Sequence, residues 1–131
     1  MNHNKLNGNH FEKELCQILY KHGFWAHNLA QNAQGQPFDV IAARKGTTWV
    51  IDCKVCENDV FRFSRVEENQ ESAMALWEMT GNTAGWFALK LSDGSIWFIT
   101  LSLIQRRRTK QAALNRDEIT SLGLPLRKWL G

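Results

Sequence analysis

The stretch PFDVIAARKGTTWVIDCKV, residues 37–55, contains two segments rich in apolar and β-branched residues, separated by Lys45 and Gly46. Two such segments around a short turn predict a β-hairpin with Lys45 and Gly46 at the centre of the turn. In that register Asp39 falls directly opposite Asp52. Two carboxylates at facing positions repel each other, because their β-carbons lie only about 5 Å apart. The hairpin therefore brings together two acids that a sheet does not ordinarily pair.

A divalent cation between the two acids accounts for this pairing. Hard carboxylate oxygens suit Mg²⁺, for which we expect Mn²⁺ to substitute, and such an ion also accepts water and phosphate oxygens. Because side chains alternate along a strand, Lys54 lies on the same side as Asp52. Its ammonium can orient an attacking water or stabilise charge on phosphorus. The hairpin therefore predicts metal-dependent hydrolysis of a phosphodiester.

Cys53 and Cys56 lie in the same stretch and form a C-x-x-C, which raises the alternative of redox chemistry or a zinc site. A redox C-x-x-C normally opens a helix, whose dipole lowers the thiol pKa, whereas polar residues follow Cys56. A structural zinc site needs four ligands, and only Cys16 and scattered histidines remain. An odd number of cysteines also argues against a disulfide framework. We therefore assign these cysteines neither role.

The periodicity of the rest of the chain predicts an α/β fold with a mixed central sheet flanked by helices. The expected elements are a mobile arm over residues 1–8, a helix from Asn9 to Lys21, a short strand over 23–29, the hairpin, a helix from Arg65 to Met79, strands over 86–91 and 95–101 around an Asp-Gly turn, and a helical extension over 104–131. A Ser64–Glu67 capping box is expected to start the second long helix. The whole chain, 1–131, is the size of one domain.

Two helices carry further candidate residues. On the first helix, Glu12 and Glu14 lie on opposite flanks of the apolar stripe, and periodicity does not choose between them. On the second helix, Gln70 lies inside the apolar stripe, where a buried amide needs partners. A metal-bound water or a carboxylate of the site would supply one.

Composition limits the classes of protein to which the chain can belong. The formal charge of +3 and the isoelectric point near 8.9 mildly favour an anionic partner. No apolar run approaches the roughly 20 residues that cross a bilayer, and the polar start lacks the pattern of a secretion signal. We expect a soluble cytoplasmic protein with no membrane partner.

The order of motifs resembles the PD-(D/E)XK nuclease superfamily, and within it the Holliday junction resolvases of the RecU and archaeal types. The resemblance rests on FEKEL (11–15), HGF (22–24), PFDVIA (37–42), VIDCK (50–54) and FRFSRVEENQ (61–70), and it covers residues 8–103. It implies the restriction-endonuclease-like αβββαβ core. It also implies Glu12, Asp39 and Asp52 as metal ligands, Lys54 as the catalytic amine and Gln70 in support. The chain departs from the pattern at Phe38, which stands where the superfamily name has Pro.

The resemblance implies an Mg²⁺-dependent endonuclease that cleaves four-way DNA junctions in phage or bacterial recombination. Such a junction has approximate two-fold symmetry, so two symmetric nicks require a homodimer. Expected contacts to DNA phosphates are Lys5, Lys13, Arg44, Arg62, Arg65, Arg106, Arg107, Arg108 and Lys110. An exposed Trp25 or Trp129 could stack on a base. The alternatives are a nuclease of the same fold that acts on linear or restriction-like sites, and a non-catalytic DNA-binding module.

Overall fold

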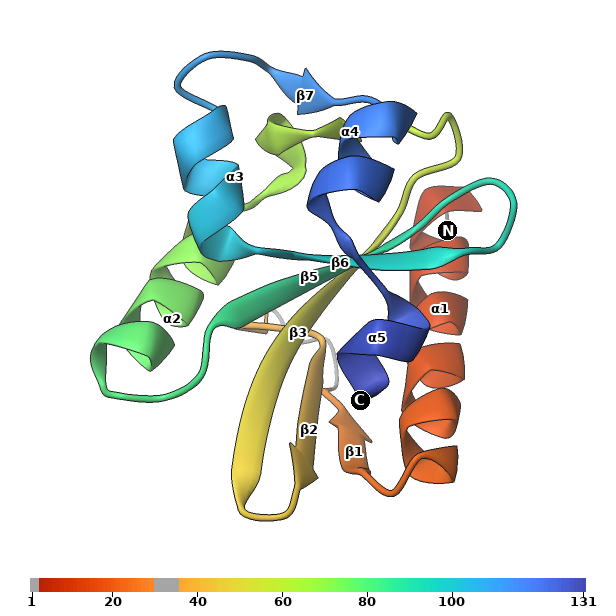
Figure 1. Ribbon diagram of the computed structural model, residues 1–131, viewed down its shortest axis with the longest axis vertical. Helices are drawn as coiled ribbons and strands as arrows, with labels where there is room; N and C mark the ends of the chain where they lie inside the picture. Colours follow the sequence, from red (N-terminus) through yellow and green to blue (C-terminus); the bar gives the residue numbers. More distant parts are fainter. Residues whose placement is uncertain (1–2, 30–35) are drawn as a thin grey trace.

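The protein is built on a six-stranded mixed sheet, seen in a computed structural model that describes residues 3–29 and 36–131 (Figure 1). The strand order is β1-β2-β3-β5-β6-β8. The strands are β1 (Trp25–Asn28), β2 (Val40–Arg44), β3 (Thr47–Val55), β5 (Gly85–Lys90), β6 (Ile96–Thr100) and β8 (Leu124–Pro125). Neighbours are antiparallel except β3 and β5, which are parallel. The expected mixed sheet is confirmed.

Helices cover both faces of this sheet. They are α1 (His3–Lys21), α2 (Glu68–Met79), α3 (Leu101–Arg107), α4 (Arg116–Leu122) and α5 (Leu126–Leu130), with a 3₁₀ turn η1 (Phe63–Arg65) before α2. A second, two-stranded sheet pairs β4 (Phe61–Arg62) with β7 (Ala113–Leu114). Within the described residues, no helix combines the length and the apolar character that a membrane span requires.

The sheet separates two hydrophobic cores. On one face, Phe11, Leu15 and Leu19 of α1 and Leu130 of α5 pack against alternate residues of the strands. On the other face, the buried side chains come from α2, α3, α4, β4 and β7, and Met74 is the fully buried residue of α2. Because strand side chains alternate, neighbouring residues of β3 belong to different cores. Any side chain on β3 is therefore fixed in direction by burial on both sides.

The turn between β2 and β3 fixes the register of the hairpin. Lys45 and Gly46 have positive φ angles of 51° and 82°, as a two-residue type I′ turn requires. Val40 pairs with Ile51, as the sequence predicts. Asp39 directly precedes Val40, and its amide donates to the Ile51 carbonyl at 3.1 Å. The regular pairing therefore ends at Val40 and Ile51, and Asp39 lies just beyond it, beside the segment that carries Asp52.

Two helix starts differ from the sequence prediction. Helix α1 begins at His3 rather than Asn9, so residues 3–8 lengthen the helix instead of forming the expected arm, and residues 1–2 lie outside the described part. Ser64 does not cap α2, because it lies in η1, where burial of Phe63 draws the chain into a tighter turn. Helix α2 begins at Glu68, and its first turn has no side-chain cap.

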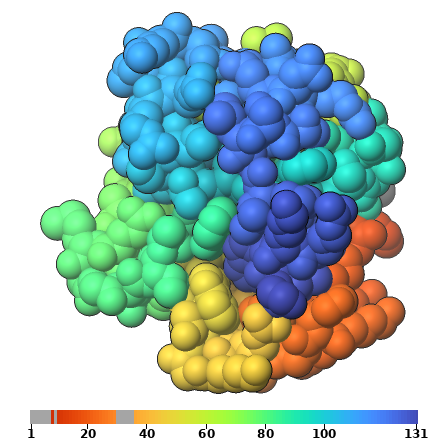
Figure 2. Space-filling model, viewed as in Figure 1, coloured from red at the N-terminus to blue at the C-terminus, as the bar shows by residue number. Residues whose placement is uncertain are grey.

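The C-terminal quarter is not the expected helical extension. Helix α3 ends at Arg107, near the start of the expected helical extension over 104–131. Beyond it, β7 pairs with β4 and β8 pairs with β6. Leu114, Ile119 and Leu130 are buried in the two cores, which explains why this part folds back onto the sheet. In the space-filling view, the last residues lie among the earlier segments and fill the middle of the visible face (Figure 2).

Candidate active site

The two acids of the hairpin are buried together near the first residue of β2. The side chain of Asp39 is 6% exposed and that of Asp52 is fully buried. The backbone amide of Cys53 donates to Asp39 Oδ2 at 2.8 Å, which ties the loop before β2 to the neighbouring strand. The two carboxyl groups lie near enough that Asp39 raises the pKa of Asp52. The sequence therefore placed these two acids close together correctly, although the regular strand pairing ends one residue before Asp39.

Helix α1 adds a third acid, Glu12. Its side chain is 5% exposed and lies near enough to the Asp39 carboxyl group for that group to raise the pKa of Glu12. Glu14, the alternative on the helical wheel, instead forms an ion pair with Lys90 at 2.7 Å. The structure thus brings Glu12 to the hairpin and directs Glu14 elsewhere. Asp39 is the neighbour that both Glu12 and Asp52 share, because its carboxylate raises the pKa of each of them.

Crowding of these acids changes their proton affinity. Burial, and then the neighbouring Asp39 carboxylate, raises the pKa of Glu12 from 4.5 to about 8. The same two causes, in the same order, raise the pKa of Asp52 well above its usual value of 3.8. The Lys54 ammonium opposes both shifts. Near neutral pH the folded cluster therefore retains protons that isolated carboxyl groups would have lost.

Lys54 and Gln70 complete the cluster. Lys54 Nζ lies 3.1 Å from Asp52 Oδ2 and 3.3 Å from Gln70 Oε1, and its side chain is 12% exposed. The Gln70 amide in turn donates to Asp52 Oδ1 at 3.0 Å. Gln70 is buried and joins the acid to the amine. The Asp52 carboxylate is one of the partners that the sequence predicted for an amide inside the apolar stripe of α2.

One residue of the cluster had no signal in the sequence. Gln36 is 6% exposed, and its Nε2 donates to Asp39 Oδ1 at 2.8 Å. Sequence patterns assigned residues 30–37 to a turn, of which 30–35 lie outside the described residues. Only the spacing of three residues between Gln36 and Asp39 could have indicated the contact, and such a spacing is common by chance.

The donor set fits a hard divalent cation. Glu12 Oε1 and Asp52 Oδ2 are buried and accept no hydrogen bond, although Lys54 forms an ion pair with the second of them. Buried polar atoms normally have partners, so these two oxygens are suited to a metal ligand role. Within the described residues, no three His, Cys, Asp or Glu side chains are already spaced to hold an ion.

Several of the cations expected to contact DNA are held by the protein itself. Arg44 donates to the Leu130 carbonyl at 2.7 Å and lies 4.0 Å over the Phe24 ring. Arg65 donates to the Val55 carbonyl at 2.8 Å. Arg108 forms an ion pair with Glu71, with one contact at 2.7 Å. These three residues therefore have structural partners.

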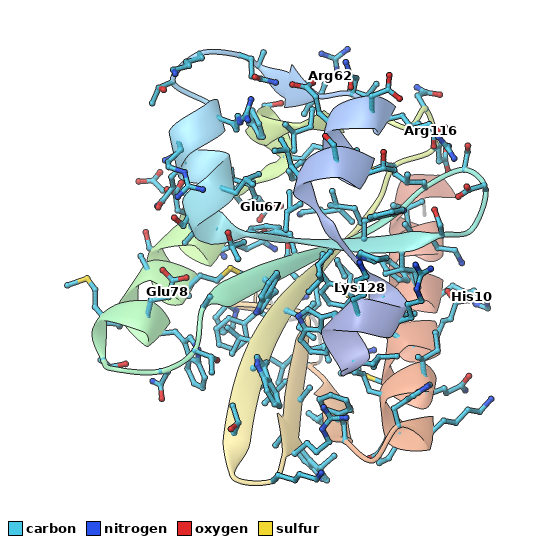
Figure 3. All side chains as sticks on the ribbon, in the orientation of Figure 1. His10, Arg62, Glu67, Glu78, Arg116 and Lys128 are labelled. Atoms are coloured by element: carbon cyan, nitrogen blue, oxygen red, sulfur yellow. The ribbon has the colours of Figure 1, made fainter. Side chains whose placement is uncertain are left out.

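The other expected cations come from several different elements. The exposed ones are Lys13, Arg62, Arg106 and Lys110, whereas Arg107 is half-buried. Arg62 lies at the β4–β7 end of the molecule (Figure 3). The side chain of Lys5 lies outside the described residues.

The remaining sequence alternatives involve buried groups. All three cysteines are buried with free thiols, and burial is the main cause that raises the pKa of Cys16 and of Cys56 to about 11. A thiol with a raised pKa is a poor nucleophile and a poor metal ligand at neutral pH. Trp129 stacks against Phe98, with ring centroids 4.5 Å apart, so it belongs to the core rather than to a base-stacking surface.

Comparison with known proteins identifies the family. The family model for archaeal Holliday junction resolvases (Hjc) matches residues 3–131. The chain belongs to this family. Crossover junction endodeoxyribonuclease Hjc of Methanocaldococcus jannaschii is 27% identical, over 97% of this chain and 96% of that protein. The solved structure of Hjc from Archaeoglobus fulgidus, a Holliday junction resolvase, superposes with a TM-score of 0.73 at 23% identity, over 95% of this chain and all of that one. The expected nuclease fold is confirmed.

Proposed function

We propose that this Hjc-family chain is a divalent-metal-dependent endonuclease that hydrolyses phosphodiester bonds in four-way DNA junctions. The observation that carries the proposal is the burial of Asp39, Asp52 and Glu12 against one another beside the Lys54 ammonium. Three acids in a buried cluster destabilise the fold unless a cation or shared protons offset their repulsion. The name of the curated relative, a crossover junction endodeoxyribonuclease, supports the choice of reaction and substrate.

We assign Glu12, Asp39 and Asp52 to the binding of Mg²⁺, for which Mn²⁺ can substitute. Bound there, the ion would polarise a phosphate oxygen and lower the pKa of a water. Glu12 must release its proton before Glu12 Oε1 can act as an anionic ligand, because its pKa is raised to about 8. Asp39 keeps its orientation through the Cys53 amide, 2.8 Å from Oδ2.

We assign to Lys54 the role of stabilising the negative charge of the reacting phosphate. Its ammonium is fixed by Asp52 at 3.1 Å and by Gln70 at 3.3 Å, which leaves one remaining N–H to donate to a phosphate oxygen or a water. Gln70 contacts the other oxygen of Asp52 at the same time. We infer that Gln70 positions the acid and the amine relative to each other and does not touch the substrate.

Junction cleavage requires two active sites related by a dyad, so we propose a homodimer of single-domain chains. DNA phosphates would be contacted by the cations named from the sequence. Arg44 and Arg108 have partners within the chain. The exposed cations are more available for contact with DNA phosphates; they are Lys13, Arg62, Arg106 and Lys110. We also propose a cytoplasmic location. The organisms named above are archaea, so a phage or bacterial host stays a prediction.

The test compares cutting of a synthetic four-way junction with cutting of a linear duplex of matched sequence, with Mg²⁺ and with EDTA. We expect paired nicks near the branch point, only with Mg²⁺, and little cutting of the duplex. Preferential cutting of the linear duplex would favour a nuclease with restriction-like sites. No cutting of either DNA, and no heat when Mn²⁺ is titrated into wild type or Asp39→Asn, would favour a non-catalytic module.

Lys54→Ala provides the residue-level test. It should bind the junction with little loss of affinity and cut it at least a hundredfold more slowly, because the phosphate charge loses its fixed ammonium. Lys21→Ala removes an exposed lysine of the same chain that is not among the expected DNA contacts and serves as the control. Wild-type cutting rates from Lys54→Ala would show that its role is misassigned.

A further inference from the structure

An aromatic pair is exposed on β1, at one edge of the sheet. Trp25 is 55% exposed, and its ring stacks on the exposed His27 ring with centroids 6.1 Å apart and an interplanar angle of 16°. Ala26, between them in the chain, points the opposite way and is buried against α1. The pair therefore presents parallel ring faces on the side of the sheet away from α1.

The strand register places this pair in line with the acids. Trp25 is level with Ala43 of β2, and His27 is level with Ile41. Asp39 is two residues before Ile41, just outside β2. Each step of two residues along a strand is about 6.6 Å, so in the strand direction His27 lies about one step and Trp25 about two steps, or about 13 Å, from the level of the acids.

The same register on β3 confirms the common face. Ala43 pairs with Thr48 and Ile41 with Val50, and Asp52 follows two residues after Val50. Residues on this side of β1, β2 and β3 thus form rows that lead from the aromatic pair to the acids. Ile41 and Ala43, which lie beside the pair on β2, are only partly buried. The aromatic pair is therefore continuous with the face that carries the candidate active site.

The chemistry of the pair suits a nucleobase. A base stacks on an indole or imidazole face whatever its sequence, and each such contact contributes about 1–3 kcal/mol. Exposed Lys45 lies at the hairpin turn just beyond Ala43 and can follow the backbone of the same DNA strand. Trp129, in contrast, is surrounded by other rings and has no face left for a ligand.

We propose that Trp25 and His27 form a stacking platform for a DNA base at the branch point of the junction, two short steps from the cleaved phosphate. This proposal rests on the proposed function, because it takes the branched DNA as the ligand. The branch point interrupts base stacking, so a base there has a free face that a linear duplex lacks. The platform thus provides recognition of the branch without reading its sequence.

The experiment measures binding in EDTA, where no cutting occurs, to a four-way junction with 2-aminopurine at the branch point and to a matched linear duplex. Trp25→Ala should bind the junction about 5- to 150-fold more weakly, which corresponds to about 1–3 kcal/mol, with little change for the duplex. Trp25→Phe should retain most of the affinity. Tyr20→Ala is the matched control, because Tyr20 is 57% exposed but lies on α1, across the sheet.

Two further measurements make the result decisive. Quenching of 2-aminopurine fluorescence by wild type, lost in Trp25→Ala and in His27→Ala, is the expected signature of stacking. Sedimentation of Trp25→Ala without DNA should give the wild-type oligomeric state, and dissociation would show that β1 contacts a second copy of the chain instead. Unchanged junction affinity in Trp25→Ala overturns the platform even if wild type cuts junctions. A wild type that quenches the probe but cuts no DNA would overturn the nuclease assignment and not the platform.

Discussion

Replacement of Glu12 by Gln should stabilise the metal-free protein at pH 8. The ordinary pKa of 4.5 becomes about 8 in the folded chain, so between these values the folded state binds more protons than the unfolded state. Stability from this group is therefore complete below pH 4.5 and is lost as the pH rises toward 8. Glutamine keeps the shape of the side chain and carries no charge to bury.

The size of the effect follows from the interval between the two pKa values. At about 1.4 kcal/mol per pH unit, the interval from 4.5 to about 8 corresponds to about 5 kcal/mol. The pKa of Asp52 is raised in the same cluster, so the variant should recover only part of it, on the order of 2 kcal/mol. At pH 4.5 wild type and variant should be nearly equal.

The assay is urea unfolding in EDTA at pH 4.5, 6.5 and 8. Glu14→Gln is the matched control on the same helix, and loss of its partly exposed ion pair with Lys90 should change stability by about 0–1 kcal/mol. A Glu12→Gln variant that is less stable than wild type at pH 8, or equally shifted at all three pH values, would show that a raised pKa of Glu12 does not govern stability.

Further predictions concern the same site and the far end of the hairpin. Mn²⁺ binding at pH 7 should release protons from the acid cluster, seen as a dependence of calorimetric heat on the buffer's ionisation enthalpy; no such dependence would contradict the raised pKa of Glu12. Gln70→Leu should slow junction cutting by about 10- to 100-fold with unchanged junction affinity, because Asp52 and Lys54 lose their common partner. Arg44→Ala should lower the unfolding free energy by about 2 kcal/mol through loss of its contacts to Leu130 and Phe24, whereas a loss of junction affinity without a loss of stability would make it a DNA contact instead.

Local rules predicted the hairpin and its acids correctly. A two-residue turn at Lys45 and Gly46 permits one register, and that register alone determines which residues face each other. Gln70 was also predictable, because a polar residue inside an apolar helical stripe must find a partner. Both inferences depend on residues near one another in the sequence or on strict periodicity.

The parts that sequence patterns missed depend on contacts between distant segments. Helical phase could not distinguish Glu12 from Glu14, since the direction of α1 against the hairpin decides which acid reaches it. The arginine run 106–108 indicated a DNA contact, but Arg108 pairs with Glu71 of another helix. Ser64 had the spacing of a capping box, yet burial of the neighbouring Phe63 determined the local backbone.

The position of Trp129 has a consequence for biosynthesis. Its ring is stacked between Phe24 and Phe98, so the aromatic layer beneath the sheet is completed by residues that leave the ribosome after all the others in that layer. Chains are synthesised from the amino-terminal end. The core against which the acid-bearing strands pack therefore stays incomplete until α5 has been synthesised. A nascent chain should therefore gain protease resistance and affinity for metal together, late in translation, rather than assembling a working centre while still incomplete.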